Sequence, residues 1–374
     1  MHILLAPDKF KGSLSAIAIA RAISKGLRAS LHSIKEINIH PLADGGDGSL
    51  DVLASYLNLD KMEVLTLDPL ERPIKSSYLC NEEMAFIEVA SASGLVLLSP
   101  SERNPRLTST LGTGLLIKNA LERGITQIYL FLGGSATNDL GFGILAALGF
   151  ELLDAAGNQL LPIGDNLGKV HTIVPSESYN WSDINFTVLC DVDNPPFGPN
   201  GAAYVYAAQK GASLEDIAFL DAGLQSSCAV IQQQSGKYVA QLAGGGAAGG
   251  IATSLFALLN ARIQPGFQLL SELTFLEDRV QKADIVISGE GKLDRQSLRG
   301  KVVDGVAKLC QKHNKPLYLF VGANELAEKD WKEHGIQAVY QVISLANELE
   351  DAMLNAEQYL EQLGQMFGER LKVD

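Results

Sequence analysis

Short apolar runs alternate with amphipathic stretches along almost the whole chain. The runs predict strands, most of them buried on both faces, at residues 3–6, 37–40, 128–132, 186–189, 285–287, 317–321 and 339–343. The stretches between them carry apolar residues at helical spacing, which predicts helices at residues 17–31, 51–57, 141–148, 251–259 and 348–369. Strands of this kind joined by helices indicate an α/β fold with a parallel sheet covered on both faces.

The length of 374 residues exceeds what one hydrophobic core usually serves, so two domains are expected. The middle of the chain breaks the alternation, because residues 66–105 carry several Pro and Ser turns and residues 165–265 contain the run NPPFGPNG. We therefore predict one discontinuous α/β domain with a second α/β domain inserted into it. The first is predicted to comprise residues 1–66, 106–160 and 268–374, and the second residues 67–105 and 161–267.

Composition and charge narrow the range of partners. Hydrophobic residues make up 47% and charged residues 20%, which is typical of a globular protein. The 30 basic and 43 acidic residues give a formal charge of −13, which argues against nucleic acid or an anionic membrane surface as a partner. A small anionic substrate stays compatible with this charge, provided that a local cluster of cations and backbone N–H groups binds it.

Cysteine spacing and the N-terminal residues predict the compartment. The four cysteines are far apart and form no CxxC pair, which is typical of reduced thiols. The first residues lack the basic region and the long apolar run of a signal peptide, and no stretch approaches the roughly 18 apolar residues of a membrane span. We expect a soluble, cytoplasmic protein that has no membrane partner. The oligomeric state is left open, with a homodimer as one possibility.

Polar and glycine-rich turns follow most of the predicted strands. In open parallel sheets, ligands bind where the carboxyl ends of strands meet helix N-termini, so these turns are the candidates for chemistry. They are DKFKGSLS (8–15), ADGGDGS (43–49), GGSATND (133–139), CDVDNPP (190–196) and GEGKLD (289–294). Their lysines and glycine N–H groups could bind an anion, and their carboxylates could bind a cation or accept a proton.

Each turn by itself also fits a capped helix or an Asp-Gly bend. Asp139, for example, could be a metal ligand or the cap of the helix that follows it. The run GGGAAGG at 244–250 formally matches GxGxxG, but the strand before it is weak and the match lies far from the N-terminal βαβ unit. We therefore reject a dinucleotide fingerprint there and keep a phosphate-binding loop as an alternative.

Several well-known enzyme motifs are missing from the sequence. It has no Walker A loop, no HRD or DFG of protein kinases, no HExxH and no GxSxG. What remains is an inventory of carboxylates, lysines and glycine turns. This inventory suits metal-assisted phosphoryl transfer, in which positioning and charge neutralisation supply most of the catalysis.

Eight motifs taken together resemble the type I glycerate kinase family, in the family's order and over almost the whole chain. They are APDKFKGSLSA (6–16), PLADGGDGS (41–49), EVASASGL (88–95), RNPRLTSTLGTGLLI (103–117), LGGSATNDLGFG (132–143), CDVDNPPFGPNGAA (190–203), GGGAAGG (244–250) and GEGKLDRQSLRGK (289–301). Two positions depart from the family pattern, since Asp47 stands where Glu is common and Asp139 is followed by Leu140 rather than Gly. Neither departure removes a functional group.

The resemblance implies ATP-dependent phosphorylation of D-glycerate with Mg²⁺ as cofactor. It also implies a Rossmann-like domain and an inserted α/β domain, with the active site in the cleft between them. The implied product is 2-phosphoglycerate, with the 3-phosphate as the alternative. Two rivals are a Rossmann-type NAD(P)-dependent dehydrogenase of a small hydroxy acid and an effector-binding regulator, although no DNA-binding segment is visible for the latter.

The motifs also carry predicted roles for individual residues. We expect Asp191 to accept the proton of the glycerate hydroxyl, with Asp44 as the second candidate. Glu290 and Asp294 are expected to bind Mg²⁺. Arg103 or Arg295 would bind the carboxylate of glycerate, and Lys11 would stabilise the leaving oxygen. The residues predicted to bind the ATP phosphates are Lys11, Lys301, Gly133, Gly134, Ser135, Gly246 and Gly249, and those predicted to bind the substrate include Asp47, Ser91 and Ser93. A phosphoserine intermediate is disfavoured because serines in such turns are more often turn formers than nucleophiles, so direct in-line transfer is expected.

Overall fold

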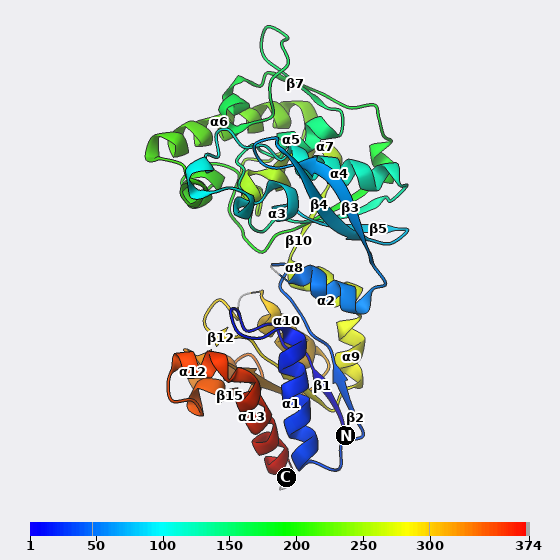
Figure 1. The fold of residues 1–374 in the computed structure, drawn as a ribbon, viewed down its shortest axis with the longest axis vertical. Coiled ribbons are helices and arrows are strands. Elements are labelled where there is room, and N and C mark those ends of the chain that lie inside the picture. Colours follow the sequence, from blue (N-terminus) through cyan, green and yellow to red (C-terminus); the bar gives the residue numbers. More distant parts are fainter. Residues whose placement is uncertain (47, 299, 372–374) are drawn as a thin grey trace. The chain divides into compact units, whose positions relative to one another are not determined.

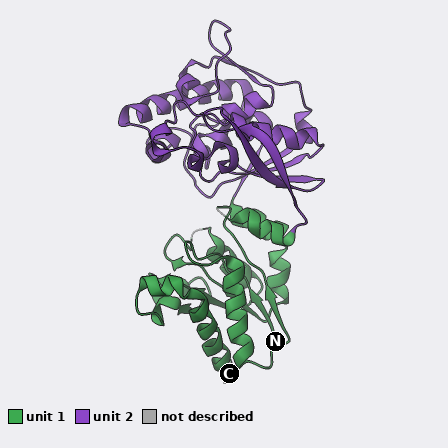
Figure 2. Cartoon of the chain, in the orientation of Figure 1, with its two compact units in different colours: residues 1–56, 265–374 green, residues 57–264 purple. Residues whose placement is uncertain are grey.

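The structure is a computed structural model that describes residues 1–46, 48–298 and 300–371. The chain forms two compact units, each with its own sheet and helices (Figure 1). Unit 1 comprises Met1–Tyr56 and Pro265–Asp374, and unit 2 comprises Leu57–Gln264 (Figure 2). Over the described ranges, no helix has both the length and the apolar character that a membrane span requires.

Unit 1 is built on a five-stranded parallel sheet. Its strands lie in the order β15-β13-β11-β1-β2, with bounds β1 His2–Leu5, β2 Glu36–Ile39, β11 Ile285–Ser288, β13 Leu317–Val321 and β15 Ile336–Gln341. A short parallel pair, β12 Lys292–Leu293 and β14 Ala323–Asn324, forms a separate small sheet. Numbered along the chain, the five-stranded order is 2-1-3-4-5, the flavodoxin-like version of the doubly wound sheet.

Helices cover both faces of this sheet because side chains alternate along each strand. Ile3 and Leu5 of β1 pack with helices α1 (Ala16–Ser30) and α13 (Ala356–Arg370). Leu4 packs on the opposite face with α9 (Leu276–Lys282) and α10 (Val302–Lys312). The other helices of unit 1 are α2 Ser49–Tyr56, α8 Gly266–Leu273, α11 Glu328–Lys332 and α12 Leu349–Leu354. The predicted covered parallel sheet is confirmed for this unit.

Unit 2 contains a six-stranded mixed sheet in the order β10-β9-β6-β5-β4-β3. The four parallel strands are β5 Met84–Glu88, β6 Gln127–Phe131, β9 Asn185–Leu189 and β10 Arg262–Gln264. The antiparallel strands are β3 Asp60–Leu67 and β4 Pro73–Cys80, and a separate hairpin pairs β7 Glu151–Leu153 with β8 Thr172–Val174. The α-helices are α3 Ala90–Ser93, α4 Leu111–Glu122, α5 Phe142–Ala147, α6 Leu214–Ser235 and α7 Ile251–Leu259.

The domain boundaries differ from those predicted. Residues 57–66 and 106–160 are predicted to belong to the first domain, but they lie in unit 2, and residues 265–267 lie in unit 1. The reason is visible in β6, which pairs with β5 and β9 in the six-stranded sheet. Its apolar run resembles that of β1, and a run of this kind does not reveal which sheet the strand joins.

Candidate active site

The carboxyl ends of β1 and β11 lie next to each other at the centre of the unit 1 sheet. Strand order reverses between these two strands, which makes this edge the topological switch point where doubly wound sheets bind ligands. The backbone N–H of Asp8 donates to the carbonyl oxygen of Gly289 at 2.8 Å, so the loop after β1 runs beside the loop after β11. Gly289 is required here, because a Cβ would lie 1.8 Å from the carbonyl oxygen of Phe320 on β13. Asp8 and Glu290 therefore follow their strands at the same edge.

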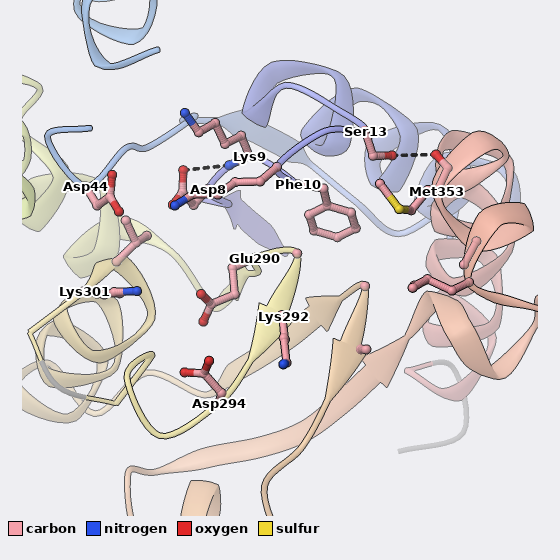
Figure 3. A pocket seen from close by; sticks show the side chains of 17 residues that line it. Asp8, Lys9, Phe10, Ser13, Asp44, Glu290, Lys292, Asp294, Lys301 and Met353 are labelled. Atoms are coloured by element: carbon pink, nitrogen blue, oxygen red, sulfur yellow. Dashed lines mark hydrogen bonds between the residues drawn. The ribbon is translucent and has the colours of Figure 1, made fainter. Parts of the chain in front are cut away.

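A cavity of about 350 Å³ opens at these strand ends (Figure 3), within the size range of small-molecule sites. Its charged lining comprises Asp8, Lys9, Lys11, Asp44, Glu290, Lys292, Asp294 and Lys301. The loops after β1, β2 and β11 and the start of α10 supply these side chains. Five residues predicted from three separate motifs thus line one cavity, namely Lys11, Asp44, Glu290, Asp294 and Lys301.

Two carboxyl groups in the cavity hold protons more tightly than usual. Burial raises the pKa of Asp8 to about 6, and the carboxylate of Asp44 adds to the effect. Burial likewise raises the pKa of Glu290 to about 7, with Asp8 among the contributors. The Oε1 atom of Glu290 is buried and has no hydrogen-bond partner in the described part of the chain. A cation or a proton would satisfy this oxygen, so the site favours positive charge.

Asp294 has a different environment. Burial acts to raise the pKa of Asp294, but the backbone N–H groups of Gln296 and Ser297 and the nearby lysines lower it overall. Those N–H groups donate to Oδ1 of Asp294 at 2.7 and 3.2 Å. Lys301 stands at the N-cap of α10, and its Nζ donates to Oε1 of Gln296 at 3.4 Å. Asp294 therefore stays anionic at neutral pH beside the cation of Lys301.

Two other predicted residues of unit 1 are not placed in this cavity. Arg295 is exposed and does not line it. Asp47 lies outside the described residues. Asp44, in contrast, lines the cavity, and its Oδ1 accepts a hydrogen bond from the backbone N–H of Gly46 at 3.1 Å.

The carboxylates of the cavity could share a divalent cation with a phosphate ligand rather than enclose it. Among the described residues, no three or more His, Cys, Asp or Glu side chains are grouped closely enough to hold a metal ion by themselves. Mg²⁺ typically binds one or two carboxylates together with substrate phosphates and water. The unpartnered Oε1 of Glu290 and the carboxylate of Asp294 suit this mode of binding.

The remaining predicted residues lie in unit 2, and the loops that carry Ser91, Gly133 and Asp191 follow β5, β6 and β9. These strands are parallel neighbours, so the loops that follow them start at one edge of the sheet. Ser135, in the loop after β6, accepts a hydrogen bond from Nζ of Lys210 at 2.9 Å, and the same Nζ donates to the carbonyl oxygen of Thr137 at 2.7 Å. Lys210 is only 3% exposed, and burial lowers the pKa of its ammonium group to about 8. The buried ammonium group of Lys210 therefore provides a positive charge at this edge of the unit 2 sheet.

Three further side chains of unit 2 carry buried polar atoms that have no hydrogen-bond partner among the described residues. The atoms are Nε of Arg103, Oγ1 of Thr137 and both amide atoms of the fully buried Asn138. The backbone of Arg103 packs against Gly211, the residue after Lys210, because a Cβ on Gly211 would be 2.1 Å from the carbonyl oxygen of Arg103. The unsatisfied Nε–H of the Arg103 guanidinium group favours an anionic ligand.

The serines and glycines predicted in unit 2 have mixed environments. The Oγ of Ser91 donates to the carbonyl oxygen of Glu88 at 2.7 Å, and the buried Oγ of Ser93 shares a hydrogen bond with Oγ1 of Thr113 at 2.7 Å. Both hydroxyls are thus engaged within the protein. Gly133 and Gly134 are exposed.

Gly246 and Gly249 are buried against the chain's own backbone. A Cβ at these positions would lie 2.3 Å from the carbonyl oxygen of Pro195 and 2.2 Å from that of Thr137. Close packing of loops therefore accounts for both glycines. Asp191 is exposed on the loop after β9.

From the sequence, Asp139 could be a metal ligand or a helix cap, and its hydrogen bonds favour the cap. Its carboxylate is fully buried and accepts from the backbone N–H and the hydroxyl of Thr110, both at 2.7 Å. It also accepts from the N–H groups of Gly141 and Gly143 at the start of α5. Asp139 is thus a buried structural cap.

Three polar residues in these clusters are not predicted from the sequence as site residues. The sequence could have identified Asp8, because it is the first polar side chain after β1 and lies in the motif DKFKGSLS. Asn138 also lies within such a motif, but its unpartnered amide appears only in the structure. Lys210 follows no strand, and no local pattern marks it.

Known proteins resemble this chain over almost its whole length. The model of the glycerate kinase family matches residues 3–372. A Halalkalibacterium halodurans protein named glycerate kinase is 38% identical over 96% of this chain and 95% of its own length. An Escherichia coli K12 protein named glycerate 2-kinase is 37% identical over 95% of this chain and 94% of its own length.

A solved structure extends the match to three dimensions. The crystal structure of a Salmonella typhimurium LT2 protein, described as a glycerate kinase 2, superposes with a TM-score of 0.87 and 37% identity, covering 100% of this chain and 98% of that one. Sequence similarity and fold both indicate a kinase that acts on a small molecule. The chain belongs to the glycerate kinase family, as the eight sequence motifs predict. These matches do not favour the NAD(P)-dependent dehydrogenase alternative.

Proposed function

We propose that this chain transfers the γ-phosphoryl group of ATP directly to the 2-hydroxyl of D-glycerate, with Mg²⁺ as cofactor. The observation that carries the proposal is the convergence of lysines and carboxylates in one cavity at the switch point of unit 1, in a member of the glycerate kinase family. The name of the Escherichia coli relative, glycerate 2-kinase, supports the 2-hydroxyl over the 3-hydroxyl.

In this proposal Glu290 and Asp294 hold Mg²⁺, and Asp8 stands beside them as a further carboxylate. The unpartnered Oε1 of Glu290 supports its role. Bound Mg²⁺ neutralises part of the charge on the phosphates. Lys11 and Lys301 bind phosphate oxygens and stabilise the charge that develops on the leaving oxygen. The exposed turn at Gly133 and Gly134, with Ser135, is a further candidate for phosphate contacts.

The carboxylate of D-glycerate binds to Arg103 in unit 2. The buried, unpartnered Nε of Arg103 supports this assignment. A guanidinium group binds a carboxylate through two parallel hydrogen bonds, which fixes the orientation of the substrate. Arg295 is the weaker candidate, because it is exposed and does not line the unit 1 cavity.

The chemical step needs one proton acceptor. Asp191 takes the proton of the 2-hydroxyl while the hydroxyl oxygen forms its bond to the γ-phosphorus. The bond between that phosphorus and the oxygen bridging the β- and γ-phosphates breaks, and its electron pair stays with ADP. Asp44 is the second candidate for the proton acceptor.

The test is an assay of ADP formation with ATP, Mg²⁺ and D-glycerate. We expect ADP formation that depends on D-glycerate. Arg103→Met should raise the KM for D-glycerate at least about tenfold, whereas Arg295→Met, a matched change at an exposed arginine, should leave it within about a factor of two. ADP formation that ignores D-glycerate would contradict the proposed reaction, and equal KM values for the two variants would contradict the role of Arg103.

A further inference from the structure

The unit 1 cavity has two ends of different chemistry. Its charged end carries the carboxylates and lysines described above, and its other end is lined by Phe10, Leu349, Ala352 and Met353. Figure 3 shows Asp8, Asp44 and Lys301 together on one side and Phe10 and Met353 on the other. The cavity is therefore amphipathic along its length.

The apolar end exposes more hydrophobic surface than a cavity wall needs. Leu349 is 65% exposed and Met353 is 42% exposed, both on α12. A second hollow, lined in part by Gly12, Leu349 and Met353, continues this surface. Apolar groups exposed next to a site commonly mark the part of a ligand that covers them.

This wall is held in place rather than loosely attached. The hydroxyl of Ser13 donates to the carbonyl oxygen of Met353 at 2.6 Å and so ties the loop after β1 to α12. Within the loop, the backbone N–H of Phe10 donates to the carbonyl oxygen of Leu14 at 2.8 Å. The loop that carries Lys11 into the charged end therefore also builds the apolar end.

We infer that the apolar end, formed by Phe10, Leu349 and Met353, is the binding site of the adenine ring of ATP. The inference rests on the proposed function and locates the base in unit 1. D-glycerate is polar throughout and gains nothing from an apolar wall, whereas a nucleotide combines an apolar flat base with an anionic phosphate chain. The lysines of the charged end complement that chain, and the thioether of Met353 provides a polarisable contact for a ring.

Isothermal titration calorimetry of ADP and of inorganic tripolyphosphate binding to the whole protein tests the adenine-binding site. Met353→Asn removes the apolar contact without adding charge. Met366→Asn on α13 is a matched control, because Met366 is also 42% exposed and does not line the cavity. Met353→Asn should weaken ADP binding about tenfold and change tripolyphosphate binding by less than about a factor of two. Met366→Asn should change neither.

Other outcomes separate this inference from the proposed function. If the unmodified protein binds ADP and Met353→Asn binds it equally well, the proposed adenine-binding site is wrong and the kinase proposal stands. If the unmodified protein binds neither ADP nor ATP, the proposed function itself fails. If Met353→Asn instead dissociates a dimer seen by sedimentation velocity and leaves ADP binding intact, a second copy of the chain covers this surface and the inference is overturned.

Discussion

Replacing Asp8 by Asn should stabilise unit 1 at alkaline pH. Burial and the carboxylate of Asp44 raise the pKa of Asp8 from its ordinary value of 3.8 to about 6. Below about pH 4, Asp8 is largely protonated in the folded and unfolded states, so it adds no cost to folding. Above about pH 6 the folded state must hold a buried carboxylate, and the cost is complete. Stability therefore falls as pH rises through this interval.

The magnitude follows from the separation between the two pKa values. At about 1.4 kcal/mol per pH unit, ionised Asp8 costs the folded state about 3 kcal/mol at pH 8 and about half of that at pH 5. Asp8→Asn removes this cost while keeping the size of the side chain. The variant should therefore have the higher free energy of unfolding, with the larger difference at pH 8. Because the pKa of Glu290 is about 7, the free energy of unfolding of the unmodified protein continues to fall at higher pH.

Urea unfolding at pH 5 and pH 8 measures the effect, with EDTA present to remove bound cations. The chain has two tryptophans, Trp181 in unit 2 and Trp331 in unit 1, so a Trp181→Phe background lets the fluorescence of Trp331 report on unit 1 alone. Asp278→Asn, at an exposed carboxylate of α9, is the matched control and should change little. The reasoning is refuted if Asp8→Asn is no more stable than Asp278→Asn at pH 8.

Three further predictions concern single residues. Asp191→Asn should lower kcat by roughly 100-fold if Asp191 is the general base, whereas Asp193→Asn in the same loop should not. A kcat that falls less than about threefold for Asp191→Asn in a steady-state assay would contradict this role. Asp294→Ala should raise the Mg²⁺ concentration needed for half-maximal activity, and an unchanged Mg²⁺ titration would remove Asp294 from the metal site. Gly289→Ala should destabilise unit 1 by about 1–3 kcal/mol or more in the same urea experiment, since its Cβ would meet a carbonyl oxygen of β13 at 1.8 Å. Gly133→Ala, where a Cβ meets nothing within 4 Å, should be nearly neutral when a Trp331→Phe background lets the fluorescence of Trp181 report on unit 2.

Local pattern predicts each strand of the unit 1 sheet and several other elements, whereas the long helix α6 is not predicted. Buried runs place β6, β9, β11 and β13 within one residue of their observed bounds, and α7 is predicted residue for residue. These elements succeed because each is apolar enough to stand out from its neighbours. β3 is missed, since its side chains are mostly exposed or half-buried and the strand shows no apolar run. The predicted C-terminal helix is interrupted at Asn355, which separates α12 from α13.

Non-local contacts set the limit of what the sequence predicts. The assignment of residues 106–160 to the first domain fails because strand pairing, rather than the apolar run of β6, decides sheet membership. The charged cavity could be predicted in part, because Lys11, Asp44, Glu290 and Asp294 each follow a strand. The buried environment of Lys210 and the unpartnered amide of Asn138 depend on distant segments, so no local pattern reveals them.

The reaction proposed for this chain is phosphorylation of the 2-hydroxyl of D-glycerate by ATP. The most direct test is to incubate the protein with ATP, Mg²⁺ and D-glycerate and to determine the product by ³¹P and ¹H NMR. We expect the new phosphorus signal to couple to the single proton on C2, as in 2-phosphoglycerate. Coupling to the two protons on C3 would contradict the proposed regiochemistry, and the absence of any phosphorylated glycerate would contradict the account as a whole.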